Sequence, residues 1–401
     1  MRTNGRGAPP TGPPVRLSPG PRARPAMRGR DPEERHRAAT SLELLFDLCF
    51  VIAVAQASES LHGALMAGEY ASGALRYALI FFTIWWAWMN FTWFGSAYDP
   101  GDVPYRLTVL VQITGSLVLA AGVSRAFDGG DLRVITLGYV VSRTALAALW
   151  LRAARSDPAR RRTALRFAVG VTACQAGWIA LLGAPDAVRV PGIVVLVVAE
   201  LAVPVWAQSA GMTPWHPRHI AERYELFTLI VIGESVAAAT VAVRGAFDRH
   251  HGIGPLYAVA AGGLVTAFAM WWLYFSRPAH TLLATTHRAH RRRFGWAYGH
   301  YLVFASAAAE GAGLAAYADH VTLGPAVPGA GAGAAVTVPA AVFLTAVWAV
   351  HLRPHQRTAA EWLPYPLTAA AILLGTWSPA PALATGALLA VLIAVDATAR
   401  R

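Results

Sequence analysis

From residue 41 onward, apolar residues come in blocks of roughly 20, and short polar segments rich in arginine separate them. A helix of about 20 apolar residues crosses the hydrocarbon core of a bilayer, because each residue adds about 1.5 Å. The pattern therefore predicts an all-α integral membrane protein with about twelve transmembrane helices. The expected ranges are 41–61, 73–94, 106–126, 132–151, 163–184, 190–210, 220–243, 255–276, 296–318, 335–352, 364–378 and 380–398.

The composition supports this class and indicates an orientation. Of the 401 residues, 55% are hydrophobic and 14% are charged, whereas a soluble globular chain carries about 25% charged residues. The formal net charge is +12, and every basic side chain other than histidine is an arginine. If the N-terminus is cytoplasmic and all twelve segments cross, 25 arginines lie on the cytoplasmic side and 6 on the other. This asymmetry follows the positive-inside rule, so we expect both termini in the cytoplasm and no nucleic-acid partner.

The first 40 residues differ from the rest, because they are rich in Pro, Gly and Arg and contain no apolar run. Such a segment cannot bury enough apolar surface to fold. We therefore expect a disordered cytoplasmic tail at residues 1–40, whose arginines interact with anionic lipids of the cytoplasmic leaflet. The lipid bilayer and these anionic lipids are the expected partners.

Two segments of the chain resemble each other. Residues 43–56 read ELLFDLCFVIAVAQ, and residues 222–235 read ERYELFTLIVIGES. An offset of 178 residues aligns Asp47 with Glu225 and Gln56 with Glu234. Tryptophan-rich segments follow both copies in the same order. The pattern predicts two parallel six-helix repeats, over residues 41–210 and 220–398.

Charged residues inside the apolar blocks are the candidates for chemistry, since each costs about 2.5–3.5 kcal/mol at a helix centre. Glu234 lies about 20 Å into its span, near the middle of the membrane, and is the leading candidate for proton binding. Neighbouring Gly233 and Ser235 allow close approach of another helix. The candidate substrate- or proton-binding residues are Glu234, Asp47, Glu43, Gln56, Glu225, Glu222, Ser235, His300 and Arg143.

Glu43 and Asp47 share one helix face near the predicted cytoplasmic end. Three interpretations stay open: a favourable interaction with the helix N-terminus, a carboxylate pair that binds a proton or cation, or a salt bridge to an arginine of another helix. Glu222, Arg223 and Glu225 are expected to form a local salt-bridge network at the interface. The remaining buried ionisable residues include Arg143, a possible counter-ion, His300, which could titrate near neutral pH, and Glu200 and Glu310.

Paired tryptophans occur in the second span of each predicted repeat. Trp85, Trp86, Trp271 and Trp272 are candidates for lining a substrate site, although packing between helices is the favoured explanation for such residues.

Enzyme signatures are missing from the sequence. It contains no Gly-rich phosphate loop, no H-E-x-x-H and no G-x-S-x-G nucleophile elbow. Cys49 and Cys174 lie in apolar segments without metal-ligand spacing. We therefore expect no enzymatic activity, no cofactor and no metal site.

The ordered set ELLFDLCFVIAVAQ, WWAWMNFTWF, Asp99–Pro100, ERYELFTLIVIGES and WWLYF resembles the bacterial low temperature requirement protein A family, from residue 41 to at least residue 320. The resemblance implies a polytopic protein of the cell inner (cytoplasmic) membrane, linked to growth in the cold, and it implies no substrate. The motif positions are Glu43, Phe46, Asp47, Gln56, Glu222, Glu225, Gly233, Glu234, Ser235, Trp271 and Trp272.

Two functions remain open. The leading hypothesis is a secondary transporter or permease for an unknown small molecule or ion, coupled to protons through Glu234 and Asp47. The alternative is a non-transporting membrane protein that senses or organises the bilayer, or supports lipid modification in the cold. Convergence of Asp47, Gln56, Glu225 and Glu234 on one cavity would favour the transporter, and separate positions would count against it.

Overall fold

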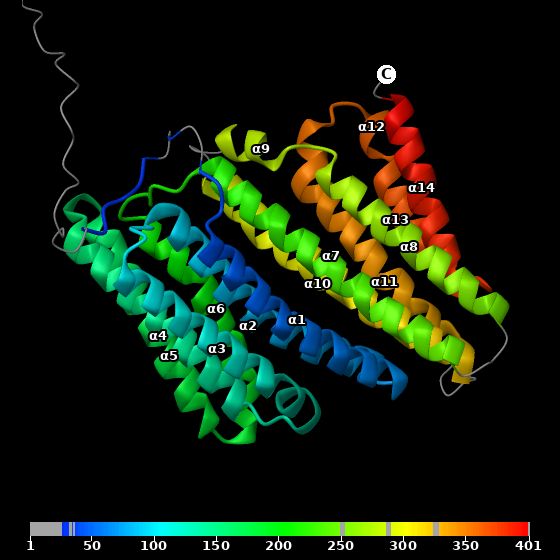
Figure 1. Ribbon diagram of the computed structural model, residues 1–401, viewed down its shortest axis with the longest axis horizontal. Coiled ribbons are helices and arrows are strands. Elements are labelled where there is room, and N and C mark those ends of the chain that lie inside the picture. The colour runs from blue at the N-terminus through cyan, green and yellow to red at the C-terminus, as the bar shows by residue number, and fades with distance from the viewer. Residues whose placement is uncertain are drawn as a thin grey trace, which may run out of the picture.

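The computed structural model describes residues 26–31, 34, 37–248, 253–285, 290–323 and 329–399. In these ranges the regular secondary structure is helical, and no β-strand occurs. Figure 1 shows two adjacent helical bundles, one built from α1–α6 and the other from α7–α14. The chain therefore belongs to the all-helical class that the apolar blocks predict.

The first bundle contains the six longest elements of the N-terminal half: α1 (Ser41–Met66), α2 (Tyr70–Ala97), α3 (Val103–Gly129), α4 (Arg133–Ser156), α5 (Arg161–Leu182) and α6 (Asp186–Gln208). The second bundle contains α7 (Pro217–Asp248), α8 (Ile253–Phe275), α10 (His290–Leu323), α11 (Gly329–Val347), α13 (Pro364–Leu374) and α14 (Pro381–Ala399). Two short helices, α9 (Ala279–Thr285) and α12 (Ala359–Trp362), lie at one edge of it.

Each of the twelve expected ranges overlaps one of these helices. Within the described residues, eight helical segments are long and apolar enough to cross a membrane. The helices α2, α7, α10 and α13 fall outside this set: α2 is rich in tryptophan, α7 and α10 carry buried charged residues, and α13 has 11 residues. Twelve crossings therefore stay a prediction, whereas a multi-pass membrane protein is supported.

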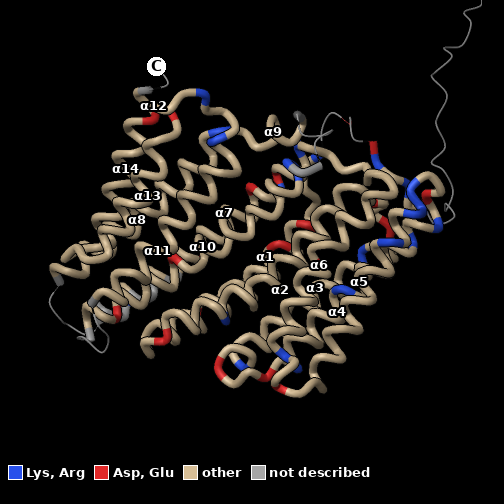
Figure 2. Tube along the Cα trace, turned by 180° about the vertical axis from the view of Figure 1, so that it is seen from behind, with Lys and Arg blue, Asp and Glu red and all other residues tan. Residues whose placement is uncertain are grey.

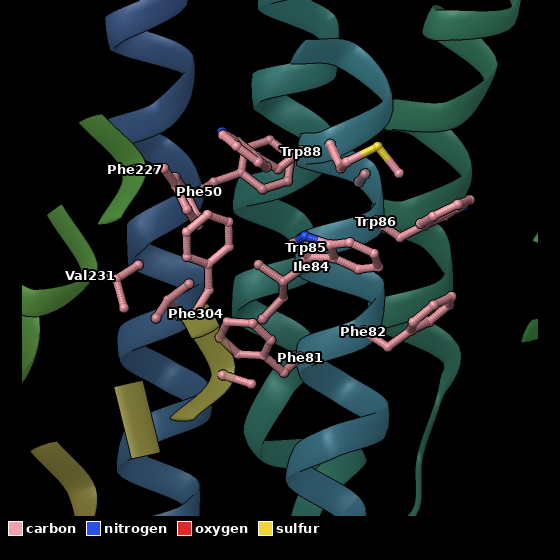
Figure 3. Packing of buried hydrophobic residues seen from close by; sticks show 14 of the residues in the cluster. Phe50, Phe81, Phe82, Ile84, Trp85, Trp86, Trp88, Phe227, Val231 and Phe304 are labelled. Carbon is pink, nitrogen blue, oxygen red and sulfur yellow. The ribbon is translucent and has the colours of Figure 1, made fainter. Parts of the chain in front are cut away.

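The two bundles meet where α1 and α2 pack against α7 and α10. Figure 3 shows aromatic side chains from α2, α7 and α10 in contact there. The ring centroid of Trp88 lies 4.3 Å from that of Phe227 and 5.6 Å from that of Phe304. The Tyr77 hydroxyl also donates to the Ala305 carbonyl at 2.7 Å. Aromatic packing and hydrogen bonds thus both contribute to this seam.

Small residues bring helices together inside each bundle. A Cβ added at Gly138 of α4 would lie 2.2 Å from the Leu119 nitrogen of α3. A Cβ added at Gly313 of α10 would lie 1.9 Å from the Ala335 oxygen of α11. Close backbone approach of this kind is typical of membrane helices, because lipid offers no hydrophobic force that drives helices together.

Helix neighbours follow a similar order in the two bundles. The first helix packs on the third and the third on the fourth, as α1, α3 and α4 in one bundle and as α7, α10 and α11 in the other. The two bundles differ at their second helix, because α8 packs extensively on α14. An internal repeat stays a prediction.

Part of the segment expected to be disordered packs against the first bundle. Residues 1–25 lie outside the described residues, but Met27 is fully buried and the Arg30 amide donates to the Ala97 carbonyl at 3.0 Å. The Arg37 guanidinium donates to the carbonyls of Gly95 and Ser96 at the end of α2. The prediction of disorder up to residue 40 is therefore wrong for this part, because its polar groups find partners on the first bundle.

Basic residues are distributed unevenly. Figure 2 shows that they gather along the edge that carries α9, α12 and the turn between α4 and α5, with fewer at the opposite edge. Helices α1 and α7 both begin at the arginine-rich edge (Figure 1). This is the distribution that the positive-inside rule predicts for a cytoplasmic edge.

Candidate functional site

Five charged or titratable side chains meet at the seam between the bundles: Arg37, Glu43, Asp47, His219 and Arg223. We call them the inter-bundle cluster. All five are buried. Their elements are the segment before α1, the first turns of α1 and the first turns of α7. The cluster therefore joins residues that are up to 186 positions apart in the chain.

The start of α1 is fixed by a capping box. The Glu43 amide donates to the Thr40 hydroxyl at 3.3 Å, and the Thr40 amide donates to the Glu43 carboxylate at 2.9 Å. This reciprocal pair satisfies two backbone donors that a helix N-terminus leaves open. Glu43 thus caps the N-terminus of α1 and also belongs to the inter-bundle cluster.

Arg223 of α7 reaches across the seam to both acids of α1. Its Nη1 lies 3.1 Å from Glu43 Oε1. Its Nε and Nη2 donate to the two carboxylate oxygens of Asp47, at 3.1 and 2.5 Å. The Trp88 indole donates to the same carboxylate at 2.7 Å. A bidentate guanidinium–carboxylate pair is among the strongest polar contacts in proteins.

His219 and Arg37 complete the cluster around Glu43. His219 Nε2 lies 3.2 Å from Glu43 Oε1, and Arg37 Nη2 lies 4.0 Å from the same oxygen. Burial lowers the pKa of the Arg37 guanidinium, and the Glu43 carboxylate opposes this shift. A Cβ at Gly95 of α2 would lie 3.1 Å from Glu43 Oε1, so a larger residue would crowd the carboxylate.

Of the three interpretations of Glu43 and Asp47, the structure contains two. Both acids pair with an arginine of another helix, and Glu43 also interacts with the N-terminus of its own helix through the capping box. The local network expected for Glu222, Arg223 and Glu225 is wrong, because Arg223 points to α1. The Glu222 carboxylate accepts a hydrogen bond from the Ala39 amide at 3.2 Å. The Glu225 carboxylate accepts a hydrogen bond from the backbone amide of Ala279, the first residue of α9.

A second buried cluster lies inside the first bundle, around Glu200 of α6. The Glu200 carboxylate accepts from Arg143 and Trp86 at 2.8 Å and from Tyr139 and Gln175 at 3.0 Å. These donors come from α2, α4 and α5, so the carboxylate ties four helices together. Arg143 is therefore the counter-ion of an acid in its own bundle.

A pair of histidines forms a third buried polar site. His300 Nε2 lies 2.9 Å from His351 Nε2 and 3.1 Å from the Tyr274 hydroxyl, and His300 Nδ1 lies 2.7 Å from the Trp296 carbonyl. His351 belongs to a π-helical stretch, Trp348–Leu352, an irregularity often found at functional sites. No group of three metal-ligating side chains occurs in the described ranges.

Glu234, the leading candidate from the sequence, lies apart from these clusters. It is half-buried, and no hydrogen bond or ion pair to it is found among the described residues. Gly233 is exposed, and a Cβ there would meet nothing within 4 Å, so the predicted close approach is absent at this residue. The approach occurs at Ser235, which faces Gly311 of α10 and donates to the Ala307 carbonyl at 2.7 Å.

The aligned polar positions do not converge. Asp47 lies in the inter-bundle cluster. Glu225 of α7 contacts the first residue of α9, and the Gln56 amide lies 3.5 Å from exposed Glu59. No cavity found in the described part of the chain is lined by these residues together with Glu234. The convergence that would favour a transporter coupled to protons through Glu234 and Asp47 is therefore not present among the described residues.

The four candidate tryptophans also occupy different environments. Trp85 and Trp86 are buried and pack against Phe82 and Tyr298, and Trp86 is a donor to Glu200. Trp271 and Trp272 are 45% and 52% exposed on α8. The four residues do not line one site together, and for Trp85 and Trp86 the structure contains packing between helices.

Sequence reasoning missed Arg223, His219 and Arg37 as members of one site. The internal alignment drew attention to acids at matched positions, and the predicted span 220–243 begins one residue after His219. The available signal was an arginine in the first turns of the second copy, opposite two acids in the first turns of the first copy.

The fold and its buried charges define a multi-pass helical membrane protein. Residues 38–397 match the family described as bacterial low temperature requirement A protein (LtrA), and the chain belongs to this family. The resemblance noted from the sequence motifs is thereby confirmed.

A curated relative is the uncharacterized protein RA0937 of Rhizobium meliloti (strain 1021), which is 30% identical over 273 residues. The match covers 64% of this chain and 64% of the relative, which is less than two thirds of the relative's length. No solved structure matches the chain.

Proposed function

We propose that the protein is a proton-coupled permease whose inter-bundle cluster locks the two bundles together at the arginine-rich edge. The observation that carries the proposal is that Arg223 of the second bundle is bound by Glu43 and Asp47 of the first. Outside this cluster the seam combines aromatic packing, such as Trp88 against Phe227, with single hydrogen bonds, such as that from Tyr77 to Ala305.

A buried ion pair adds little net stability, but removing one of its partners is costly. Replacing a whole buried pair by apolar residues is often neutral, whereas removing one partner costs about 3–5 kcal/mol. Protonation of Asp47 would remove the bidentate partner of Arg223. A change of about 3 kcal/mol shifts a two-state ratio more than 100-fold, which is enough to switch the preferred arrangement of two bundles.

The proposal assigns the proton-sensitive role to Asp47 and Glu43 in place of Glu234. It also includes twelve crossings, two parallel repeats, and both termini at the cytoplasmic face of the inner membrane. The similar helix order of the two bundles and the gathering of arginines at one edge support these parts.

The test uses vesicles that contain the purified full-length protein and the pH-sensitive dye pyranine. Under an inward proton gradient, the vesicles are challenged with pools of small solutes on either side. We expect one pool to change lumenal pH with the wild type and to have no effect with Asp47→Asn. Glu59→Gln, which alters an exposed acid of the same helix, should respond like the wild type.

Two outcomes would contradict the proposal. One is an equal solute-dependent proton movement with Asp47→Asn. The other is no solute-dependent proton movement by the wild type with any pool. The second outcome would favour a non-transporting role in the bilayer, for which the exposed Trp271 and Trp272 on α8 provide membrane-facing aromatic anchors.

A further inference from the structure

The second bundle contains a buried glutamate that the lock does not use. Glu310 of α10 is 2% exposed, and neither of its carboxylate oxygens has a hydrogen-bond partner among the described residues. A buried polar group without a partner costs about 1–3 kcal/mol, and more if it is charged. Such a group in a folded protein needs an explanation, and a missing ligand is one.

Glu310 lines a cavity of about 220 Å³ between α7, α8 and α10. The other walls are almost wholly apolar and include Ile232, Val259, Leu264 and Met270. The Ser235 hydroxyl also lines the space, but its hydrogen is directed to backbone carbonyls of α7 and α10. Glu310 therefore supplies the only ionisable group among the lining residues described for this cavity.

Helix packing holds the carboxylate in place. A Cβ added at Gly311 would lie 2.6 Å from the Ser235 Cα, so α10 and α7 are in direct backbone contact beside Glu310. The Ser235 hydroxyl donates to the carbonyl of Ala307, which lies one turn before Gly311 on α10. The carboxyl group is thus positioned by rigid elements, as binding sites require.

The cavity extends toward the membrane-facing surface. A shallow groove next to it shares Ile232, Val236 and Ala267 with the cavity lining. The groove also includes Phe268, Trp271 and Trp272, all of which are exposed. A ligand dissolved in the bilayer could therefore reach Glu310 laterally, between α7 and α8.

We propose that this cavity binds a small lipophilic amine, whose ammonium group pairs with Glu310 and whose apolar body fills the space. An N–H cation satisfies the carboxylate oxygens, and the apolar walls require an apolar body. The volume exceeds the roughly 150 Å³ that accommodates benzene in an engineered apolar cavity, so one aromatic ring with a short chain fits. The proposal concerns binding and does not depend on transport.

The experiment measures binding of tritiated phenethylamine to the purified full-length protein in lipid nanodiscs. Propylbenzene, which has the same shape and no charge, serves as the neutral comparator. We expect saturable binding of the amine to the wild type. Glu310→Gln should weaken amine binding at least tenfold, because a hydrogen bond to a charged group is lost. Binding of propylbenzene should change less than threefold.

Two further variants keep the proposal falsifiable. Ala260→Phe fills the cavity and should abolish binding of both compounds. Glu234→Gln is the matched control, because Glu234 precedes Ser235 yet is not among the cavity lining, and it should bind like the wild type. Wild-type affinity for the amine in Glu310→Gln would overturn the proposal. So would amine binding by the wild type that does not exceed that of Ala260→Phe.

Discussion

Glu200 and Glu310 are both buried glutamates inside helical bundles, yet their surroundings are opposite. Glu200 in the first bundle accepts hydrogen bonds from four side chains, one of them the cation of Arg143. Glu310 in the second bundle has no partner in the described residues and faces a cavity. The same side chain therefore serves as a structural tie in one bundle and is available for a ligand in the other.

The difference indicates which helices of the molecule can rearrange relative to one another. A carboxylate that binds donors from three neighbouring helices resists any rearrangement of them, because each donor would lose its partner. A carboxylate without donors imposes no such restraint. The inter-bundle cluster is intermediate, since its acids are paired, but with a partner that belongs to the other bundle.

The largest loss of stability is expected at Glu200, whose carboxylate accepts hydrogen bonds from four side chains. Glu200→Gln keeps the size of the side chain but removes its charge, which leaves the buried Arg143 cation without a counter-ion. We expect a loss of about 3–5 kcal/mol in the free energy of unfolding. The measurement is unfolding in mixed micelles followed by tryptophan fluorescence. A loss below about 1 kcal/mol would show that the four donors do not act as a tie.

The sequence predicts the helices well, because their apolar blocks have the length of a membrane span. It also gives three interpretations of Glu43 and Asp47, and the structure contains two of them: the interaction of Glu43 with the helix N-terminus and the salt bridge to an arginine of another helix. It does not identify Arg223 as their partner, because the pairing joins positions 176 residues apart and depends on how α1 and α7 pack. The arginine of the second copy and the acids of the first copy are visible in the sequence, but neither copy alone shows that they pair.

The contrast between the two glutamates is equally invisible in the sequence. Glu200 and Glu310 are both single acids in long apolar blocks, and neither has a basic residue within one helical turn. Their environments are set by other helices: α2, α4 and α5 supply donors to Glu200, whereas α7 and α8 present apolar side chains to Glu310. The local sequence around an acid therefore cannot separate a structural tie from a binding group.

An intermediate effect is expected at the seam. Asp47→Asn removes the charge that binds Arg223, but Glu43 remains 3.1 Å from the same guanidinium. We expect a loss of about 1.5–3 kcal/mol in the free energy of unfolding, because hydrogen bonds to a charged group are weakened while one counter-ion remains. The same micelle titration measures it. Exposed Glu59→Gln should change the value by less than about 0.5 kcal/mol.

A loss at Asp47 as large as the loss at Glu200 would contradict the ranking. It would mean that the seam is as tightly tied as the interior of the first bundle. A loss no larger than that of Glu59→Gln would show that Arg223 does not depend on Asp47. Either result would remove the physical basis for a lock that a proton can open.

The smallest effect is expected at Glu310, although the substitution is the same as at Glu200. Glu310→Gln breaks no hydrogen bond in the described structure, so the free energy of unfolding should stay within about 0.5 kcal/mol of the wild type when no amine is present. The micelle titration compares the two glutamine variants directly. With saturating phenethylamine, the wild type should gain stability by mass action and Glu310→Gln should gain much less. A loss of about 3 kcal/mol without ligand would mean that Glu310 has a structural partner after all, and the two glutamates would then be alike.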